Sequence, residues 1–416
     1  QRMIFEAFLK RLIRFGDLTV VRPDGTEFSV HGRPFPRTRP ADTPGPVTIR
    51  ISDPGVFRRL PWQPALAFGE GYMEGSVTIE QGSLADMLAL FMINARQDPG
   101  ALLNLRYRLD RVLRFLHQNN PMPQSRRNVA HHYDLSPKLY ETFLDADRQY
   151  SCAYFPTGNE SLEAAQAAKK RHIAAKLLLE PGQRVLDIGC GWGGMALYLA
   201  KHFDVEVTGI TLSEEQLLVA RGRAEAAGLA DKVRFELTDY RAVAGRFDRI
   251  VSVGMFEHVG VRQYRAYFAA VRRALADGGV ALVHTIGRSD PPGGTNAWIR
   301  KYIFPGGYCP ALSEVMEEVE RESLVACDIE VLKLHYAETL KHWHRRFEAD
   351  RAETGDMLDE RFCRMWEFYL LGCEAAFRHE AQVVFQLQIS RDKTTVPDTR
   401  DYITQFEATH PLPIAI

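Results

Sequence analysis

The sequence predicts an α/β protein: a Rossmann-like, doubly wound parallel sheet preceded by a smaller α+β domain. Three observations support this. The apolar run Val185–Ile188 leads directly into a glycine-rich turn, strand and helix patterns alternate from Gln183 onward, and short strand patterns separated by glycines precede both.

The first 116 residues form the predicted smaller domain. Phe5 to Phe15 has helical spacing, and Leu18 to Arg22 resembles a strand followed by the turn Pro23-Asp24-Gly25. Further strands are predicted at 47–52 and 77–80, and a helical stretch at 84–115. The polar, proline-containing segment 117–126 predicts a linker, which makes 127–416 the second domain.

The second domain has the order of elements that a parallel sheet requires. Strands are predicted at 185–188, 206–210, 233–237, 247–253 and 280–284. The helices between them are predicted at 195–203, at 213–227 with Ser213 as cap, and at 264–276, ended by Gly278-Gly279. A long helical region, 338–379, and a strand-like run, 382–389, follow.

Composition excludes several classes of protein. The 416 residues are 45% hydrophobic and 25% charged with a net charge of -1, which argues against a nucleic-acid binder. The six cysteines form no C-x-x-C pair, so neither a zinc site nor a disulfide framework is expected. No apolar run approaches the roughly 18 residues of a membrane span and no signal peptide is recognised, so we expect a cytoplasmic protein.

The glycine-rich turn predicts a nucleotide-sized pocket. Gly189, Gly191 and Gly193 allow positive φ and close approach of a ligand to the backbone, and the next helix directs its free N–H groups at the same place. Asp187 precedes the first glycine and no G-K-[ST] follows, which argues against a phosphate-binding P-loop. S-adenosylmethionine is therefore the favoured ligand.

Polar residues at the predicted strand ends should meet at one edge of the sheet. They are Asp187, Thr211 and Ser213, Asp239 and Tyr240, Glu257 and His258, and His284. Solvated loops or helix caps are the alternative explanation, and for Ser213 a cap is favoured. We predict that Glu257 and His284 act as a pair in acid–base chemistry, against the alternative of a histidine bonded to a backbone carbonyl.

Aromatic segments on either side of the sheet have two interpretations. Residues 128–136 and 150–155 form either a lid over the pocket or a helical layer with buried tyrosines. Cys152 has no neighbouring base, so a thiolate nucleophile is not implied. Residues 298–307 either line a lipid-sized groove or cover the sheet.

Seven motifs between Arg127 and Arg391 together resemble the cyclopropane fatty acid synthases and the related mycolic acid cyclopropane synthases. They are HHYDLS at 131–136, YSCAYF at 150–155, VLDIGCGWGG at 185–194, GITLSEEQ at 209–216, VGMFEHVG at 253–260, HTIG at 284–287 and YIFPGGY at 302–308. The resemblance implies a class I methyltransferase fold. It also implies transfer of the methyl group of S-adenosylmethionine to the double bond of an unsaturated phospholipid acyl chain, followed by proton loss and ring closure.

The resemblance also implies site residues. Bicarbonate, as the base, would be held by Cys152 and Ile286 through their backbones and by Glu257, His284 and Tyr336. The implied contacts of S-adenosylmethionine are Tyr150, Ser151, Asp187, Gly189, Gly191, Gly193, Thr211, Leu212, Gln216 and Tyr240. Tyr133, Tyr302 and Phe304 offer π faces to a cation. No acid ends the second strand, and Gln216 is expected to replace it.

Alternatives within and outside the enzyme class remain open. One is a relative that yields methyl- or methylene-branched lipids, or that methylates a small amine. Another is a lipid-binding protein with a degenerate domain, against which Asp187 and the Glu257/His284 pair argue. Peripheral contact with the inner face of the membrane is expected through Lys10, Arg11, Arg14, Arg58, Arg59, Arg106, Arg108, Arg111 and Arg114. The alternative is a solvated helix face. A homodimer follows from the family precedent alone.

Overall fold

A computed structural model describes residues 2–36, 39, 42–97 and 137–412. The chain divides into two compact units of three segments each. One unit comprises the described residues of 1–113, Gly293–Ile303 and Leu340–Gln382, and the other the described residues of 114–292, Phe304–Thr339 and Val383–Ile416. The predicted linker, 117–126, lies outside the described residues.

The larger unit contains a seven-stranded sheet with the strand order β10-β11-β9-β8-β5-β6-β7. β5 to β9 are paired in parallel, and β10 is antiparallel to β11. The strands are β5 (Arg184–Ile188), β6 (Glu206–Thr211), β7 (Val233–Leu237), β8 (Phe247–Val253), β9 (Leu275–Arg288), β10 (Val325–Leu332) and β11 (Gln382–Ser390). The predicted α/β, Rossmann-like methyltransferase fold is confirmed.

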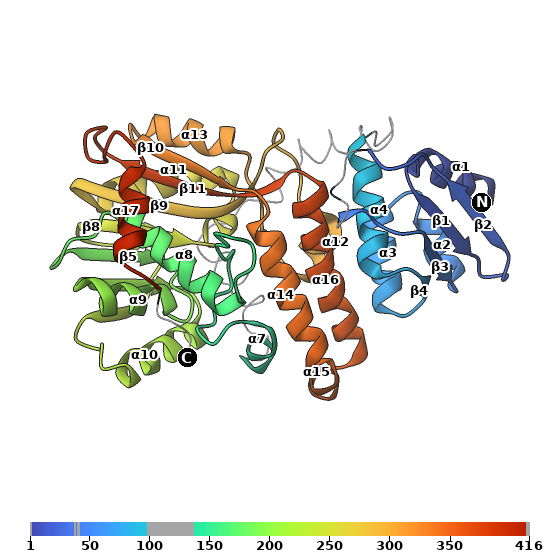
Figure 1. Ribbon diagram of the computed structural model, residues 1–416, viewed down its shortest axis with the longest axis horizontal. Coiled ribbons are helices and arrows are strands. Elements are labelled where there is room, and N and C mark those ends of the chain that lie inside the picture. Colours follow the sequence, from blue (N-terminus) through green and yellow to red (C-terminus); the bar gives the residue numbers. More distant parts are fainter. Residues whose placement is uncertain (1, 37–38, 40–41, 98–136, 413–416) are drawn as a thin grey trace. The chain divides into compact units, whose positions relative to one another are not determined.

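Helices cover both faces of this sheet because successive residues of each buried strand point to opposite sides (Figure 1). Val185 packs with α8, α9 and α10, whereas its neighbour Leu186 packs with α11 and α13. These helices are α8 (Leu162–Leu177), α9 (Gly194–Phe203), α10 (Glu214–Ala226), α11 (Tyr264–Ala274) and α13 (Leu312–Arg321). The unit also contains α7 (Pro137–Phe143), α17 (Asp401–Thr409) and the 3-10 turns η2 (Tyr240–Ala242), η3 (Phe256–His258) and η4 (Val261–Gln263).

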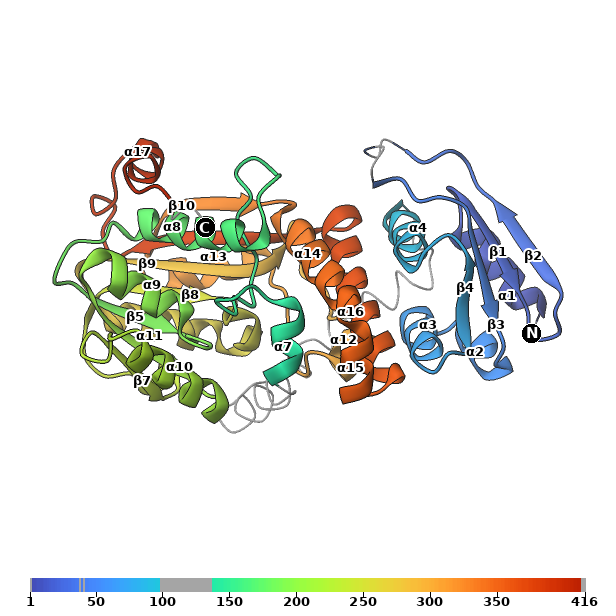
Figure 2. The same ribbon diagram turned by 60° about the horizontal axis from the view of Figure 1, so that its bottom comes forward.

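The smaller unit is built on a four-stranded sheet with the order β2-β1-β3-β4. Its strands are β1 (Asp17–Val21), β2 (Glu27–His31), β3 (Val47–Ile51) and β4 (Val77–Gln81). Helices α3 and α4 run beside this sheet (Figure 2). The helices are α1 (Arg2–Leu12), α2 (Pro54–Arg59), α3 (Pro64–Met73), α4 (Leu84–Gln97), α12 (Ala297–Tyr302), α15 (Arg351–Met357) and α16 (Glu360–His379). Helix α14 (His335–Ala349) is divided: residues 335–339 belong to the larger unit and the rest to the smaller one.

Segments distant in the sequence complete the core of the smaller unit. Helix α16 packs against α3 and α4, and α12 packs against α3. The rings of Trp298 and Phe368 lie 4.6 Å apart, and a Cβ at Gly69 would be 2.5 Å from Trp298. The absence of a side chain at Gly69 therefore lets α3 approach the indole closely.

Some predicted boundaries were wrong. The helical region predicted at 338–379 begins earlier, at His335, and consists of three helices, α14, α15 and α16, separated by breaks near Asp350 and Asp359. Gly278-Gly279 does not end a helix: α11 ends at Ala274 and both glycines lie within β9. The helix predicted from Phe5 ends at Leu12, before Phe15, which forms a bridge with Arg33. No helix among the described residues is both long and apolar enough to cross a bilayer.

Candidate active site

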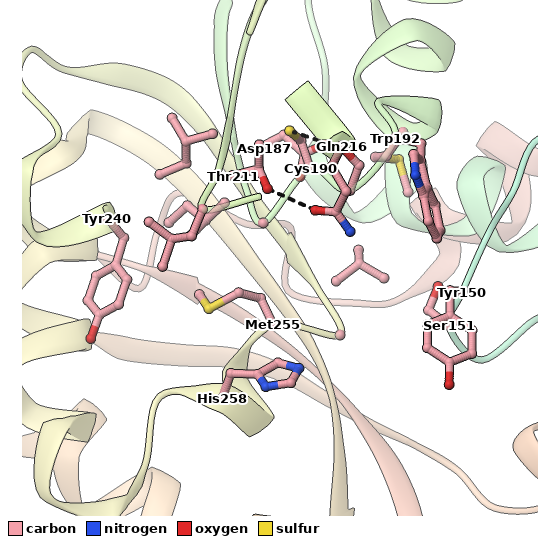
Figure 3. A pocket seen from close by; sticks show the side chains of 18 of the residues that line it. Tyr150, Ser151, Asp187, Cys190, Trp192, Thr211, Gln216, Tyr240, Met255 and His258 are labelled. Carbon is pink, nitrogen blue, oxygen red and sulfur yellow. Dashed lines mark hydrogen bonds between the residues drawn. The ribbon is translucent and has the colours of Figure 1, made fainter. Parts of the chain in front are cut away.

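A pocket in the larger unit opens at the carboxyl ends of β5, β6, β7 and β8 (Figure 3). This is where a doubly wound sheet binds its ligands. Nine of the ten predicted cofactor-binding residues line it: Tyr150, Ser151, Asp187, Gly189, Gly191, Thr211, Leu212, Gln216 and Tyr240. Gly193 does not line it.

The glycine turn has the predicted backbone conformation. Gly189, Gly191 and Gly193 have φ values of 80°, 55° and 85°. A Cβ at Gly189 would lie 2.7 Å from the Met255 side chain, and one at Gly193 would lie 2.6 Å from the ring of Phe235. Gly193 therefore does not contact the ligand space but lets the turn pack closely against the ring of Phe235 on β7.

Asp187 is the penultimate residue of β5, just before this turn, and is only 1% exposed. Burial raises the pKa of its carboxyl to about 7, although the nearby Lys169 opposes the rise. Its Oδ2 has no hydrogen-bond partner among the described residues. A buried oxygen that lacks a donor is suited to a ligand that brings one.

The ends of β6 and β7 supply the next side chains. The Thr211 hydroxyl donates to Gln216 Oε1 at 2.8 Å, and the predicted cap Ser213 accepts from the Gln216 backbone N–H at 3.2 Å. The two bonds fix the amide of Gln216 at the pocket wall (Figure 3). After β7, Asp239 binds the Arg241 guanidinium through both oxygens, each at 2.8 Å, beside Tyr240.

Two side chains of α8 hold the segment Gln149–Ser151 against the pocket. The Gln166 amide donates to the carbonyls of Gln149 and Ser151, at 3.1 and 3.0 Å. Lys169 is fully buried and donates to Gln149 Oε1 and to Ser151 Oγ, both at 2.7 Å. Because the ammonium donates to Ser151 Oγ, the hydroxyl hydrogen of Ser151 is available to an acceptor in the pocket.

Glu257 and His284 are both buried, but no hydrogen bond joins their side chains in the described part of the chain. Glu257 Oε1 accepts from the Ile286 backbone N–H at 2.6 Å, and His284 Nδ1 faces the Gln386 amide at 3.1 Å. Burial raises the pKa of Glu257 to about 7 and lowers that of His284 well below its usual range. Their other polar atoms, Glu257 Oε2 and His284 Nε2, have no partner among the described residues.

Cys152 and Tyr336 come from separate segments that hydrogen bonds tie together. Thr339 Oγ1, on α14, accepts from the Ala153 backbone N–H at 3.0 Å, and His335 Nδ1 accepts from that of Phe155 at 3.0 Å. Burial raises the pKa of the Cys152 thiol, which argues against a thiolate nucleophile. Tyr336 itself is 7% exposed.

The five predicted catalytic residues, Cys152, Glu257, His284, Ile286 and Tyr336, do not line the pocket, but His258 next to Glu257 does. Burial lowers the pKa of His258 to about 4, so this imidazole is neutral at pH 7. Sequence analysis placed His258 beyond a strand end without giving it a role. The sequence analysis also missed Lys169. The only indication in the sequence is that this lysine lies in the alanine-rich part of a helix, after Ala167 and Ala168. Tyr133 and the 131–136 motif lie outside the described residues.

Comparison with known proteins identifies the family. Residues 121–387 match the family model described as mycolic acid cyclopropane synthetase. The chain is 39% identical over 350 residues to the cyclopropane-fatty-acyl-phospholipid synthase of Escherichia coli K12, covering 83% of this chain and 88% of the relative. It is 34% identical over 412 residues to the tuberculostearic acid methyltransferase UfaA1 of Mycobacterium tuberculosis, covering 94% and 91%.

A solved structure agrees with the sequence relatives. The mycolic acid cyclopropane synthase CmaA1 complexed with SAH and CTAB matches with a TM-score of 0.61 and 33% identity, covering 65% of this chain and 98% of that one. The glycine turn, the strand-end pocket and these matches together establish that the chain belongs to the mycolic acid cyclopropane synthetase family and is an S-adenosylmethionine-dependent methyltransferase.

Proposed function

We propose that the protein adds a methylene group to the cis double bond of an unsaturated phospholipid acyl chain and so forms a cyclopropane fatty acid. The observation that carries this proposal is a pair of buried polar atoms, Glu257 Oε2 and His284 Nε2, which lack partners among the described residues. Ring closure requires the removal of a proton from carbon, which a positioned acid–base group promotes.

S-adenosylmethionine fits the strand-end pocket and would supply a methyl group activated by its sulfonium charge. The unpartnered Asp187 oxygen and the available Ser151 hydroxyl hydrogen suit the ammonium and carboxylate of its amino-acid part. The open space at Gly191 permits close approach of the ligand to the backbone. We assign its binding to Tyr150, Ser151, Asp187, Gly189, Gly191, Thr211, Leu212, Gln216 and Tyr240, and Gly193 contributes through the conformation of the turn.

The reaction demands a site that excludes water. The alkene carbon bonds to the methyl carbon as the carbon–sulfur bond breaks, which leaves a cation on the acyl chain. Loss of one proton from the added carbon then closes the ring, and a water molecule in the site would intercept the cation first. Glu257 and His284, 9% and 2% exposed, present polar atoms without opening the site to solvent.

Bicarbonate, held by Glu257, His284 and Tyr336 and by the backbones of Cys152 and Ile286, would supply the base. The chemistry of these groups suits an anion. With a pKa near 7, the Glu257 carboxyl can carry a proton and donate it in a hydrogen bond. The Ile286 N–H donates to Glu257 Oε1. It can therefore bind the anion directly only if the Glu257 side chain rotates away, and otherwise it positions the carboxyl that does.

A second candidate is formation of a methyl- or methylene-branched chain. The similarity to UfaA1, named a tuberculostearic acid methyltransferase, favours keeping it. The methylene-branched chain would arise from the same cation by a hydride shift followed by proton loss from the added carbon, and a saturated methyl branch would need a further reduction by a hydride donor.

The test is incubation of the purified protein with S-adenosylmethionine, bicarbonate and vesicles of monounsaturated phospholipid, with the released acyl chains analysed by mass spectrometry and NMR. A gain of one CH₂ with cyclopropane protons supports the proposal. The same gain with vinylic methylene signals, or a gain of CH₂ plus two hydrogens with methyl-branch signals, supports the second candidate. Glu257→Ala, which removes both the donor and the acceptor, should abolish most turnover without weakening S-adenosylmethionine binding, whereas the exposed control Glu225→Ala should behave as wild type.

We also propose peripheral contact with a membrane surface. Helix α1 exposes Met3 and Ile4, 81% and 52% accessible, on the same short helix as the exposed Lys10 and Arg11. Arg106, Arg108, Arg111 and Arg114 lie outside the described residues. Cosedimentation with anionic vesicles, lost on Lys10→Glu with Arg11→Glu, tests this contact. The homodimer stays a prediction.

A further inference from the structure

A chain of buried polar side chains leads from the surface of the larger unit to His284. Glu330, on β10, accepts hydrogen bonds from the Lys176 ammonium and from His172 Nε2, the latter at 2.6 Å. Lys176, on α8, also donates to Gln386 Oε1 at 2.8 Å, and the other end of that amide lies 3.1 Å from His284 Nδ1. Lys176 and Gln386 are fully buried and His284 is 2% exposed.

The direction of each hydrogen bond in this chain is determined by chemistry. An ammonium can only donate, so the Gln386 atom that faces Lys176 must be the carbonyl oxygen. The amide nitrogen of Gln386, which can only donate, is then left facing the imidazole. His284 Nδ1 must accept this bond, so in the neutral ring the hydrogen is on Nε2.

From these contacts we infer that Lys176 and Gln386 are positioning residues that hold His284 as the Nε2–H tautomer, so that its free nitrogen acts as a hydrogen-bond donor in the reaction. This inference rests on the proposed function for its catalytic part. An Nε2–H matches the need of a bound anion, whereas a bare Nε2 lone pair would repel it. His284 is accordingly assigned the role of a donor and not that of the base.

Burial lowers the pKa of Lys176, and two neighbouring carboxylates oppose this fall and favour the charged form. The Glu330 carboxylate contacts it directly, and its Nζ lies 3.9 Å from Asp328. The pKa of Glu330 is well below its usual range, because its bonds to His172 and Lys176 outweigh its partial burial. A permanent anion on β10 therefore keeps the lysine a donor toward Gln386.

The substitution that tests this is Gln386→Glu, because a carboxylate has two acceptors and no donor. It should draw a hydrogen to His284 Nδ1, which in the neutral ring leaves Nε2 without one. The matched control is Gln388→Glu, on the same strand and equally buried, whose amide bonds Lys176 O and Tyr402 instead of the imidazole. The conservative Lys176→Arg keeps a cationic donor and should keep the tautomer.

The readout is two-bond proton–nitrogen correlation NMR on the full-length protein labelled at histidine nitrogen, with His284→Gln used to identify the His284 signals. Wild type, Gln388→Glu and Lys176→Arg should show Nε2–H, and Gln386→Glu should show hydrogen on Nδ1. A wild-type Nδ1–H tautomer, or Nε2–H retained in Gln386→Glu, overturns the inference. Circular dichroism checks that each variant is folded. If Gln386→Glu does not fold, Lys176→Met replaces it as the test variant, and we expect it to show a mixture of the two tautomers.

The catalytic part has a separate readout. Gln386→Glu should lower kcat at least about tenfold, the cost of losing one hydrogen bond to an anion, with S-adenosylmethionine affinity unchanged. A tautomer change with unchanged kcat rejects the donor role in catalysis. Absence of any lipid product from the wild type rejects the proposed function, while the NMR result still decides the tautomer.

Discussion

Replacing Lys169 with methionine should weaken S-adenosylmethionine binding while leaving the free energy of unfolding nearly unchanged. Two opposing quantities set the stability. The substitution removes two hydrogen bonds of 2.7 Å from a charged donor, worth roughly 3 to 6 kcal/mol together. It also removes a buried ammonium whose pKa burial lowers from 10.5 to about 7, which corresponds to about 5 kcal/mol.

The difference between these two quantities is within about 2 kcal/mol, so the variant should fold. The pH dependence gives a further check. Between pH 7 and 10.5 the unfolded chain binds a proton at Lys169 that the folded protein has lost, so wild-type stability should rise with pH across this range. Lys169→Met should lack that part of the rise.

Cofactor binding responds differently because Lys169 orients the Ser151 hydroxyl. Losing that orientation should raise the Kd for S-adenosylmethionine about tenfold, the equivalent of one hydrogen bond to a carboxylate. Isothermal titration calorimetry measures the Kd and urea unfolding the stability. The control is Lys170→Met, one residue further along α8, where the lysine pairs with Asp147 instead of Ser151. An unchanged Kd in Lys169→Met would refute the reasoning.

Two further predictions concern the floor of the pocket. Because the pKa of Asp187 is raised to about 7, its carboxyl ionises between pH 6 and 8 and then attracts the positively charged cofactor. Wild-type affinity for S-adenosylmethionine should rise across this range, whereas Asp187→Asn should bind more weakly and show no such rise. The measurement is the Kd from calorimetric titrations at several pH values. The same change of Kd with pH in both proteins would contradict this prediction. Gly193→Ala should lower the free energy of unfolding by about 2 to 5 kcal/mol, because φ is 85° and the new Cβ meets Phe235 at 2.6 Å. Urea unfolding measures this, and Gly222→Ala, an open helical position, should be neutral or stabilising.

Local patterns were sufficient to predict the parallel half of the large sheet. Strands 233–237 and 247–253 have the predicted limits, and β5, β6 and β11 differ by one residue. The strand predicted at 280–284 is longer at both ends, because β9 spans Leu275–Arg288. Buried parallel strands are short apolar runs between helices, so periodicity and turn residues locate them. The edge strand β10 was missed, because Val325–Leu332 is half-buried and gains its partner, β11, only through the fold.

The pocket was largely predictable, whereas the groups that support it were not. Asp187 and Thr211 lie at the ends of β5 and β6, and Tyr240 follows β7 by three residues, so chain order alone brings them together. The Lys176–Gln386–His284 contacts join residues more than 100 positions apart, and only the packing of α8 against the sheet creates them. For the same reason, the bonding partners of Glu257 and His284 differ from the predicted pairing.

The interleaving of the two compact units affects how the gene can be divided. Each unit draws on three stretches of chain, and α16, near the end of the sequence, completes the core around α3 and α4. A fragment that starts at residue 127 would keep Trp298 and Phe368 but lose the α3 surface they pack on. The N-terminal stretch is therefore not a detachable module, and exchanging it between proteins requires exchanging the matching faces of α12 and α16 as well.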